Sequence, residues 1–277
     1  MFALRNYKKL ISALLVTIII TTACNRVAGR IPVAEGGFVI DKNGVITGYK
    51  GKGGDIVIPD TINGIKITAI GERAFLKCES LISITIPYSV TSIGELAFVG
   101  CRNLNKISIP DSVTSIGKIA FSGCESLTSI NIPSGVTKIE DYTFVGCISL
   151  KSITIPERVT SIGNHAFNHC VNLSSITISD SVASIRESAF WGCENLKNIT
   201  IPSSVTRIDR AAFAFCDNLA ECIFLGNAPE NFGYFVFDDA HYDFKIYYSE
   251  TSKGFTTPEW NGYPCYPVVK EKGGNEQ

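Results

Sequence analysis

Residues 107–129 read ISIPDSVTSIGKIAFSGCESLTS, and most of the chain repeats this stretch with small changes. A cysteine returns at every twenty-third position, and an apolar frame of Ile, Pro, Val, Phe and Leu accompanies each one. A fixed period of this length is the signature of a solenoid, in which each copy stacks on its neighbours. The cysteines of the series are Cys78, Cys101, Cys124, Cys147, Cys170, Cys193 and Cys216.

Each copy begins with a predicted strand. In residues 81–86 the alternation places Ile84 and Ile86 on one face and Ser83 and Thr85 on the other, which is typical of a half-buried strand. Proline follows in most copies and ends the strand, because it cannot donate to a ladder. A short extended piece, a turn and a single predicted helical turn then lead to the Phe and the Cys.

Stacked in register, these copies predict a repeat solenoid. One wall is a parallel β-sheet, and short extended and helical-turn segments form the other. The phenylalanines of successive copies form an aromatic column. No copy can bury its apolar residues alone, so we expect stability to come from the interfaces between copies.

The two ends of the repeat array differ from its middle. Residues 38–49 alternate around Asn43-Gly44, which predicts a β-hairpin with a type I′ turn. After residue 221 the frame changes, and an aromatic-rich segment predicts a β-rich C-terminal cap. The expected division is 1–23 signal peptide, 24–37 tether, 38–58 hairpin cap, 59–221 repeats of about 23 residues, 222–269 C-terminal cap and 270–277 disordered tail.

The N-terminal segment predicts export. Basic residues precede an apolar run over residues 10–20, which is too short to span a bilayer, and small residues follow it. The stretch Thr21-Thr22-Ala23-Cys24 resembles a bacterial lipobox, although Thr21 stands where an aliphatic residue is usual. That resemblance implies acylation of Cys24; the alternative is an ordinary signal cut near Ala23. We expect an exported lipoprotein of the outer membrane or cell surface, with the side that the anchor faces left open.

The repeat itself resembles a known family. From Ile109 to Leu127 the chain follows I-P-x-x-V-T-x-I-G-x-x-A-F-x-x-C-x-x-L, the phrase of the leucine-rich repeats in BspA-like bacterial surface proteins, also called the Treponema pallidum type. The resemblance extends over about residues 38–269. It implies display at the cell surface and adhesion to host or bacterial proteins, and it assigns no binding residue to this chain.

The cysteines of an exported protein invite a disulfide interpretation. The seven that share one position in the repeat instead predict a column of buried thiols, each a small apolar residue that also donates weakly to a carbonyl. Cys222 and Cys265 both fall in the predicted C-terminal cap and could form a bridge, but Cys216 is also close to Cys222 in sequence. This pairing stays open.

Signals for chemistry are weak. His165 and His169 are four residues apart, but no third or fourth metal ligand stands at a suitable spacing, so we expect solvent-facing side chains. His241 lies among aspartates in a cap loop, a poor calcium pattern. The sequence contains no hydrolase, metalloprotease or phosphate-loop signature. We therefore expect no enzyme, no cofactor and no metal.

The predicted outer face of the strands is a wall of small hydroxyls and amides. Such a flat surface suits a broad protein or glycan contact better than a small substrate, although the same residues are also ordinary strand formers. Trp191 is predicted to be an exposed contact at the turn edge, because tryptophan is enriched in binding hot spots. The candidate wall residues are Ser83, Thr85, Lys106, Ser108, Ser129, Asn131, Ser152, Thr154, Ser175, Thr177, Asn198 and Thr200.

Composition limits the partners. The formal net charge is −1 and charged residues make up 18% of the chain, which argues against nucleic acid as a ligand. The first function hypothesis is a lipid-anchored, non-enzymatic surface module that binds a host extracellular-matrix or bacterial surface protein. The alternative is a structural or assembly component of the bacterial envelope that binds other envelope proteins.

Overall fold

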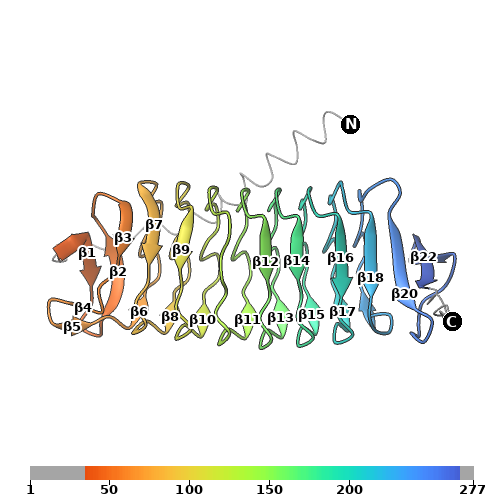
Figure 1. The fold of residues 1–277 in the computed structure, drawn as a ribbon, viewed down its shortest axis with the longest axis horizontal. Helices are drawn as coiled ribbons and strands as arrows, with labels where there is room; N and C mark the ends of the chain where they lie inside the picture. The colour runs from red at the N-terminus through yellow and green to blue at the C-terminus, as the bar shows by residue number, and fades with distance from the viewer. Residues whose placement is uncertain (1–34, 269–277) are drawn as a thin grey trace, which may run out of the picture.

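The computed structural model describes residues 35–268, and these form an elongated solenoid of stacked rungs (Figure 1). Each regular rung contributes one strand to each of two parallel ladders, with turns between them. This architecture confirms the predicted repeat solenoid. Hydrogen bonds between neighbouring rungs run along the whole stack, so the long axis of the molecule follows the order of the repeats.

The first ladder, called the strand wall here, carries the predicted half-buried strands. Its pairing joins each residue to the one in the next copy, as in Ser152 with Ser175 and Thr154 with Thr177. Residues 129–131 of the fourth copy are not in a strand. The strands are β3 (Gly54–Val57), β7 (Leu81–Thr85), β9 (Lys106–Ser108), β12 (Ser152–Thr154), β14 (Ser175–Thr177), β16 (Asn198–Ile201), β18 (Glu221–Phe224) and β20 (Lys245–Ser249).

The second ladder is built from two-residue strands, most of which end in a buried isoleucine. The rungs approach so closely here that a Cβ on Gly94 would lie 2.7 Å from the backbone nitrogen of Glu72. The absence of a side chain therefore permits this packing. The strands are β6 (Ala69–Ile70), β8 (Ser92–Ile93), β10 (Ser115–Ile116), β11 (Lys138–Ile139), β13 (Ser161–Ile162), β15 (Ser184–Ile185), β17 (Arg207–Ile208) and β19 (Asn231–Phe232).

The segments predicted as helical turns are not helical, and we call their surface the turn wall (residues 95–100 in the second copy). Their backbone joins neighbouring rungs: Leu96 N–H donates to the Lys118 carbonyl at 3.0 Å, and Phe98 N–H to that of Ala120 at 2.8 Å. A helix would use these N–H groups internally. Leu96, with φ of 60°, and Gly100, with φ of 70°, supply the left-handed positions of the turn. Among the described residues the only helix is the 3₁₀ segment η1 (Glu35–Gly37).

A column of phenylalanines fills the centre of the solenoid. Successive rings are parallel to within 19° or less, and their centroids lie 5.0–5.6 Å apart. The predicted column is confirmed and is longer than expected, because Phe237 joins it after a spacing of 24 residues. The members are Phe75, Phe98, Phe121, Phe144, Phe167, Phe190, Phe213 and Phe237, and all are buried.

The N-terminal end is closed by the predicted hairpin of β1 (Phe38–Ile40) and β2 (Val45–Tyr49). Its turn differs from type I′, because Gly44 has a positive φ and Asn43 does not. Instead, the Asp41 carboxylate accepts hydrogen bonds from the Asn43 and Val45 N–H groups, each at 2.9 Å. The Tyr49 ring contacts Phe75 at 5.3 Å and so covers the end of the column. A second hairpin, β4 (Thr61–Ile62) with β5 (Ile65–Lys66), accounts for the longer first rung.

The C-terminal end continues the stack before it closes. Strand β20 pairs in parallel with β22 (Tyr263–Val268), which also pairs antiparallel with β21 (Glu259–Trp260). The Tyr263 hydroxyl accepts a hydrogen bond from the Phe237 N–H at 3.1 Å. The cap therefore provides a partner for the backbone N–H of the last phenylalanine in the column. Trp260 covers the end of the core against Phe224 and Phe232.

The open question about Cys222 and Cys265 is answered by the register. Cys222 pairs with Ile246, and Ile246 pairs with Cys265, so the two cysteines are separated by two strand spacings, about 9–10 Å. A disulfide requires Cα atoms within roughly 7 Å. Both cysteines are buried and free.

The phenylalanine column gives the first testable expectation. Phe144→Ala removes a fully buried ring that stacks on Phe121 at 5.6 Å and on Phe167 at 5.2 Å. We expect the free energy of unfolding to fall by about 3–5 kcal/mol, measured by chemical denaturation. Tyr88→Ala, at a side chain that is 77% exposed, is the control and should change it by less than about 0.5 kcal/mol. Equal losses for both variants would contradict a stability that depends on the column.

Candidate functional site

The strand wall presents the predicted outward residues to solvent. All are exposed except Ser83, which is half-buried and donates a hydrogen bond to the Asp55 carboxylate. Lys106 is the only charged residue among them. The wall therefore presents many hydroxyl and amide groups and almost no charge. These side chains point outward as predicted, but their orientation alone assigns them no ligand.

The turn wall differs from its prediction. Val99 and Val145, which occupy the position of Trp191 in other copies, are 1% and 5% exposed, because this position faces the packed interior of the turn. Ser122 and Asn168, at the same position of other copies, are buried as well. This position of the repeat is therefore buried in these four copies and offers no surface contact there.

Trp191 occupies the same position and is only half-buried. Its ring lies between His169, with centroids 4.6 Å apart, and Phe215, with centroids 5.0 Å apart. The expectation of a freely exposed tryptophan is therefore wrong, because its neighbours along the stack support both sides of the ring. One part of the indole remains accessible, and that part borders a hollow.

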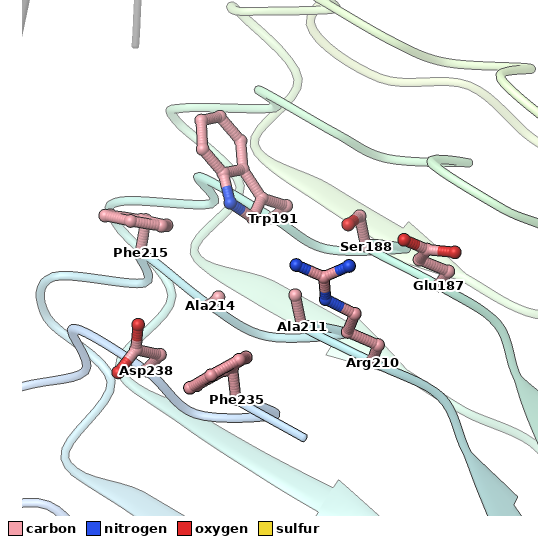
Figure 2. A pocket seen from close by; sticks show the side chains of 9 residues that line it. All are labelled: Glu187, Ser188, Trp191, Arg210, Ala211, Ala214, Phe215, Phe235 and Asp238. Carbon is pink, nitrogen blue, oxygen red and sulfur yellow. The ribbon is translucent and has the colours of Figure 1, made fainter. Parts of the chain in front are cut away.

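The hollow lies on the turn wall of the last three rungs and has a volume of about 390 Å³ (Figure 2). Three aromatic side chains, Trp191, Phe215 and Phe235, stand around it, and small residues form its floor. Phe235 is 57% exposed, so one side of the hollow is an open aromatic face. The lining residues are Glu187, Ser188, Trp191, Arg210, Ala211, Ala214, Phe215, Phe235 and Asp238.

The hollow exists because the side chains at one position of the repeat become smaller along the stack. We call the residues at one position of successive copies a column. The first left-handed position of the turn carries larger side chains in the earlier copies and shrinks to Ser188 and Ala211 before Phe235 restores bulk. The next column inward likewise changes from Trp191 to Ala214. The residues at the left-handed position in the second to fifth copies are Leu96, Ile119, Tyr142 and His165. Comparing the copies column by column could have located this step from sequence.

Polar groups in the hollow lack partners in the protein. Ser188 is 7% exposed, and its hydroxyl makes no hydrogen bond to any residue between 35 and 268. Arg210 forms no ion pair in that range, whereas Arg186, one rung earlier, lies 3.5 Å from Asp209. Burial and the neighbouring Asp239 raise the pKa of Asp238. The hollow thus combines unused donors with carboxylate acceptors.

A histidine cluster supports Trp191 from the preceding rung. Asn168 Nδ2 donates to His165 Nδ1 at 3.2 Å, and Asn168 Oδ1 accepts from His169 Nδ1 at 2.9 Å. The His165 ring also stacks on Tyr142, with centroids 4.9 Å apart. The expected solvent-facing histidines are therefore half-buried and tied together by an amide, an arrangement that requires an unprotonated Nδ1 on His165.

Burial lowers the pKa of His165, although Glu187 and Asp141 act in the opposite direction. Because the folded-state pKa lies below the unfolded value of about 6.5, the unfolded chain takes up this proton first as the pH falls. The contribution of His165 to stability is therefore present above pH 6.5 and is lost as the pH falls from there through the folded-state pKa.

The His165→Asn variant tests this pH dependence. Asparagine tolerates the left-handed φ of 53° but does not titrate. We expect the variant to lose part of the decrease in the free energy of unfolding between about pH 6.5 and 5, measured by urea denaturation at each pH. Ile119→Asn, at the same turn position of an earlier copy, should keep that decrease. A wild-type slope in His165→Asn would contradict the assignment.

The cysteine column is structural. From Cys101 to Cys216 each thiol donates to the carbonyl of the phenylalanine 26 residues earlier, as in Cys101 to Phe75 at 3.0 Å and Cys147 to Phe121 at 3.2 Å, which confirms the predicted donors in six copies. Cys78 differs from the prediction, because it is half-buried at the end of the column and its sulfur lies 3.8 Å from the Ser80 hydroxyl. Burial raises the pKa of Cys147 to about 12. These thiols are therefore neither nucleophiles nor metal ligands at neutral pH.

Thiol labelling checks this interpretation. In the Cys24→Ser chain we expect only Cys78, which is half-buried, to react quickly with an aromatic disulfide reagent at neutral pH. The buried cysteines should react after unfolding in guanidinium chloride, with mass spectrometry locating each label. Rapid native labelling of Cys124 or Cys170 would contradict the closed column.

Neither a metal centre nor a membrane span is found in the described part of the chain. Between residues 35 and 268 no group of three or more His, Cys, Asp or Glu side chains is placed to hold a metal ion. None of the helices in that range is long and apolar enough to cross a membrane. Cys24 lies outside the described residues.

Two parallel ladders and a central phenylalanine column, repeated every 23 residues, define a leucine-rich repeat solenoid. The family model of the BspA type leucine-rich repeat region matches residues 54–170 and 137–251, with six copies. The chain therefore belongs to the BspA-type leucine-rich repeat family, which confirms the resemblance seen in the repeat. No curated protein matches the chain in sequence.

Solved structures agree with this family. A leucine-rich cell surface protein from Faecalibacterium prausnitzii A2-165 is 36% identical with a TM-score of 0.61, over 71% of this chain and 56% of that one. The leucine-rich repeat protein of T. pallidum is 32% identical with a TM-score of 0.62, over 70% and 91%. One from Bacteroides ovatus ATCC 8483 is 28% identical with a TM-score of 0.62, over 88% and 67%. The match thus spans little more than half of the F. prausnitzii protein.

Proposed function

We propose that this protein is a non-enzymatic binding module of the bacterial cell surface that contacts a protein ligand through its strand wall. The observation that carries this proposal is the row of exposed, almost uncharged hydroxyl and amide side chains from Thr85 to Thr200. A flat array on a rigid parallel ladder can meet a broad partner without a large loss of side-chain entropy, because Ser and Thr have few rotamers. The ligand is an extracellular-matrix protein of a host or a surface protein of another bacterium.

Family membership supports surface display. The similar F. prausnitzii protein is described as a cell surface protein. The basic, apolar and small-residue order of segment 1–23 supports export, and Cys24 supports a lipid anchor in the outer membrane or at the cell surface. No step of catalysis is proposed, since neither the strand wall nor the cysteine column supplies a nucleophile or a general base at neutral pH.

A charge scan tests the wall. Ser152→Glu, Ser175→Glu and Asn198→Glu add three charges to exposed positions of β12, β14 and β16. We expect adhesion to immobilised matrix proteins or partner cells to fall at least tenfold, because three carboxylates would have to lose water in a contact that has almost no charge of its own. Surface plasmon resonance with the purified chain measures the change.

The matched control carries the same change in charge on the other ladder. Ser115→Glu with Lys138→Glu also shifts the net charge by −3, on exposed positions of β10 and β11. This variant should bind like the wild type. If the wall variant keeps full binding, the strand wall is not the contact.

The lipid anchor has its own test. We expect Cys24→Ser to move the protein from the detergent phase to the aqueous phase of a cloud-point extraction of producing cells, because the acyl chains are lost. Cys78→Ser, a control at a half-buried cysteine of the first rung, should remain in the detergent phase. Retention of Cys24→Ser in the detergent phase, or aqueous partition of the wild type, would contradict acylation.

The second candidate, an envelope assembly component, is separated from adhesion by the partner. Crosslinking in intact cells followed by mass spectrometry identifies proteins bound to the wild type but not to the wall variant. Envelope proteins of the same bacterium would favour assembly, whereas host or foreign-cell proteins would favour adhesion.

A further inference from the structure

We propose that the hollow between Trp191 and Phe235 is a second binding site, which takes one ring of a neutral glycan. It lies on the turn wall, away from the strands β12, β14 and β16 on which the proposed protein contact depends. The two proposed sites can therefore be tested independently of each other.

The size of the hollow suits a single small unit. Its volume of about 390 Å³ lies at the lower end of the roughly 300–1,000 Å³ typical of small-ligand sites. A protein interface instead covers about 800 Å² on each partner and has no need of a hollow. The small floor residues Ala211 and Ala214 leave room for a ring rather than for a flat contact (Figure 2).

The aromatic walls fit the C–H face of a pyranose. The Trp191 and Phe215 rings meet at 58°, with centroids 5.0 Å apart, so they form a corner rather than one plane. Phe235, 57% exposed, stands across the hollow (Figure 2). A sugar ring has a flat apolar face and a polar edge, and it can stack on one of these rings while its hydroxyls remain at the open side.

The polar groups match hydroxyls, which both donate and accept. Ser188 and Arg210 supply donors without a partner in the described chain, and the carboxylates of Glu187 and Asp238 supply acceptors. The Ser188 residue is 7% exposed, and its hydroxyl opens to the hollow, so a ligand hydroxyl can take over the hydrogen bond that water otherwise makes there. A purely apolar ligand would leave all these groups unused.

Charge excludes anionic ligands. Two carboxylates and one guanidinium line the hollow, and Asp239 lies next to Asp238, so a sialylated or sulfated glycan would meet net repulsion. A neutral sugar does not meet that repulsion. The same excess of carboxylates would attract a cationic side chain, so the experiment has to separate a sugar from a peptide.

The experiment uses tryptophan emission. The chain has two tryptophans, and Trp260→Phe leaves Trp191 as the single reporter. The full chain with Cys24→Ser in this background is titrated with chitohexaose, cellohexaose, maltohexaose and mannohexaose, and with sialyllactose and heparin. We expect saturable quenching by at least one neutral oligosaccharide and none by the two anionic glycans.

Variants locate the site by calorimetric titration with the neutral oligosaccharide that binds. Ala211→Leu fills the hollow with the residue that the second copy accommodates at the same left-handed position, and it should abolish binding. Glu187→Gln should weaken binding about threefold to tenfold, since one acceptor oxygen is replaced by a donor. The control Ile119→Leu, at the same position outside the hollow, should bind like the wild type, and circular dichroism confirms that each variant is folded.

Three outcomes would overturn the proposal: no neutral oligosaccharide quenches Trp191, only anionic glycans bind, or Ala211→Leu and Glu187→Gln both bind with wild-type affinity. Quenching by a protein ligand without any oligosaccharide binding would assign the hollow to a protein contact and overturn it as well. If Ala211→Leu does not fold, Glu187→Gln and Arg210→Ala decide alone, because both residues are exposed. Loss of matrix-protein binding in the wall variant leaves these results unaffected.

Discussion

The structure depends on the spacing at which one rung hydrogen-bonds to the next. Parallel strands lie about 4.8 Å apart, and every other feature of a copy has to repeat at that interval. Phenylalanine rings stack at 5.0–5.6 Å with nearly parallel planes, which is close to this spacing and leaves only a small offset. The thiols from Cys101 to Cys216 use the same interval to reach the phenylalanine carbonyl of the previous rung. A residue type therefore fits a recurring buried position when its side chain can stack on the same side chain in the neighbouring rung.

The same constraint gives the turn wall a direction. In every copy the joining N–H groups donate toward the C-terminal end, from Phe75 to Ala97 and onward to Phe213 and Val236. Aligned peptide groups leave unpaired carbonyls at the first rung and unpaired N–H groups at the last, which is the reverse of the order in an α-helix. Each end needs a cap for this reason, and Tyr263 supplies one by accepting from Phe237.

The period of the sequence predicts most of this fold, because successive copies can be compared and the same residue types recur at equivalent positions. The strand wall, the phenylalanine column and the thiol donors follow from the alternation and the interval. The turn wall could not be predicted in the same way: Glu95-Leu96-Ala97-Phe98 has good helix formers, yet the bonds between rungs compete for the same N–H groups. The extension to Phe237 was hidden by one additional residue, which shifts the spacing without breaking the stack.

The candidate sites show where such reasoning is weakest. Exposure on the strand wall follows from a period of two, so its residues could be named from sequence. The surroundings of Trp191 depend on residues one rung away in each direction, His169 and Phe215, which are 22 and 24 positions distant in the chain. In a solenoid the neighbours of a side chain are its equivalents in adjacent copies. The residues that form a binding site therefore occupy one position of the repeat in adjacent copies. The small residues Ser188 and Ala211 distinguish the hollow from the recurring positions that serve folding alone.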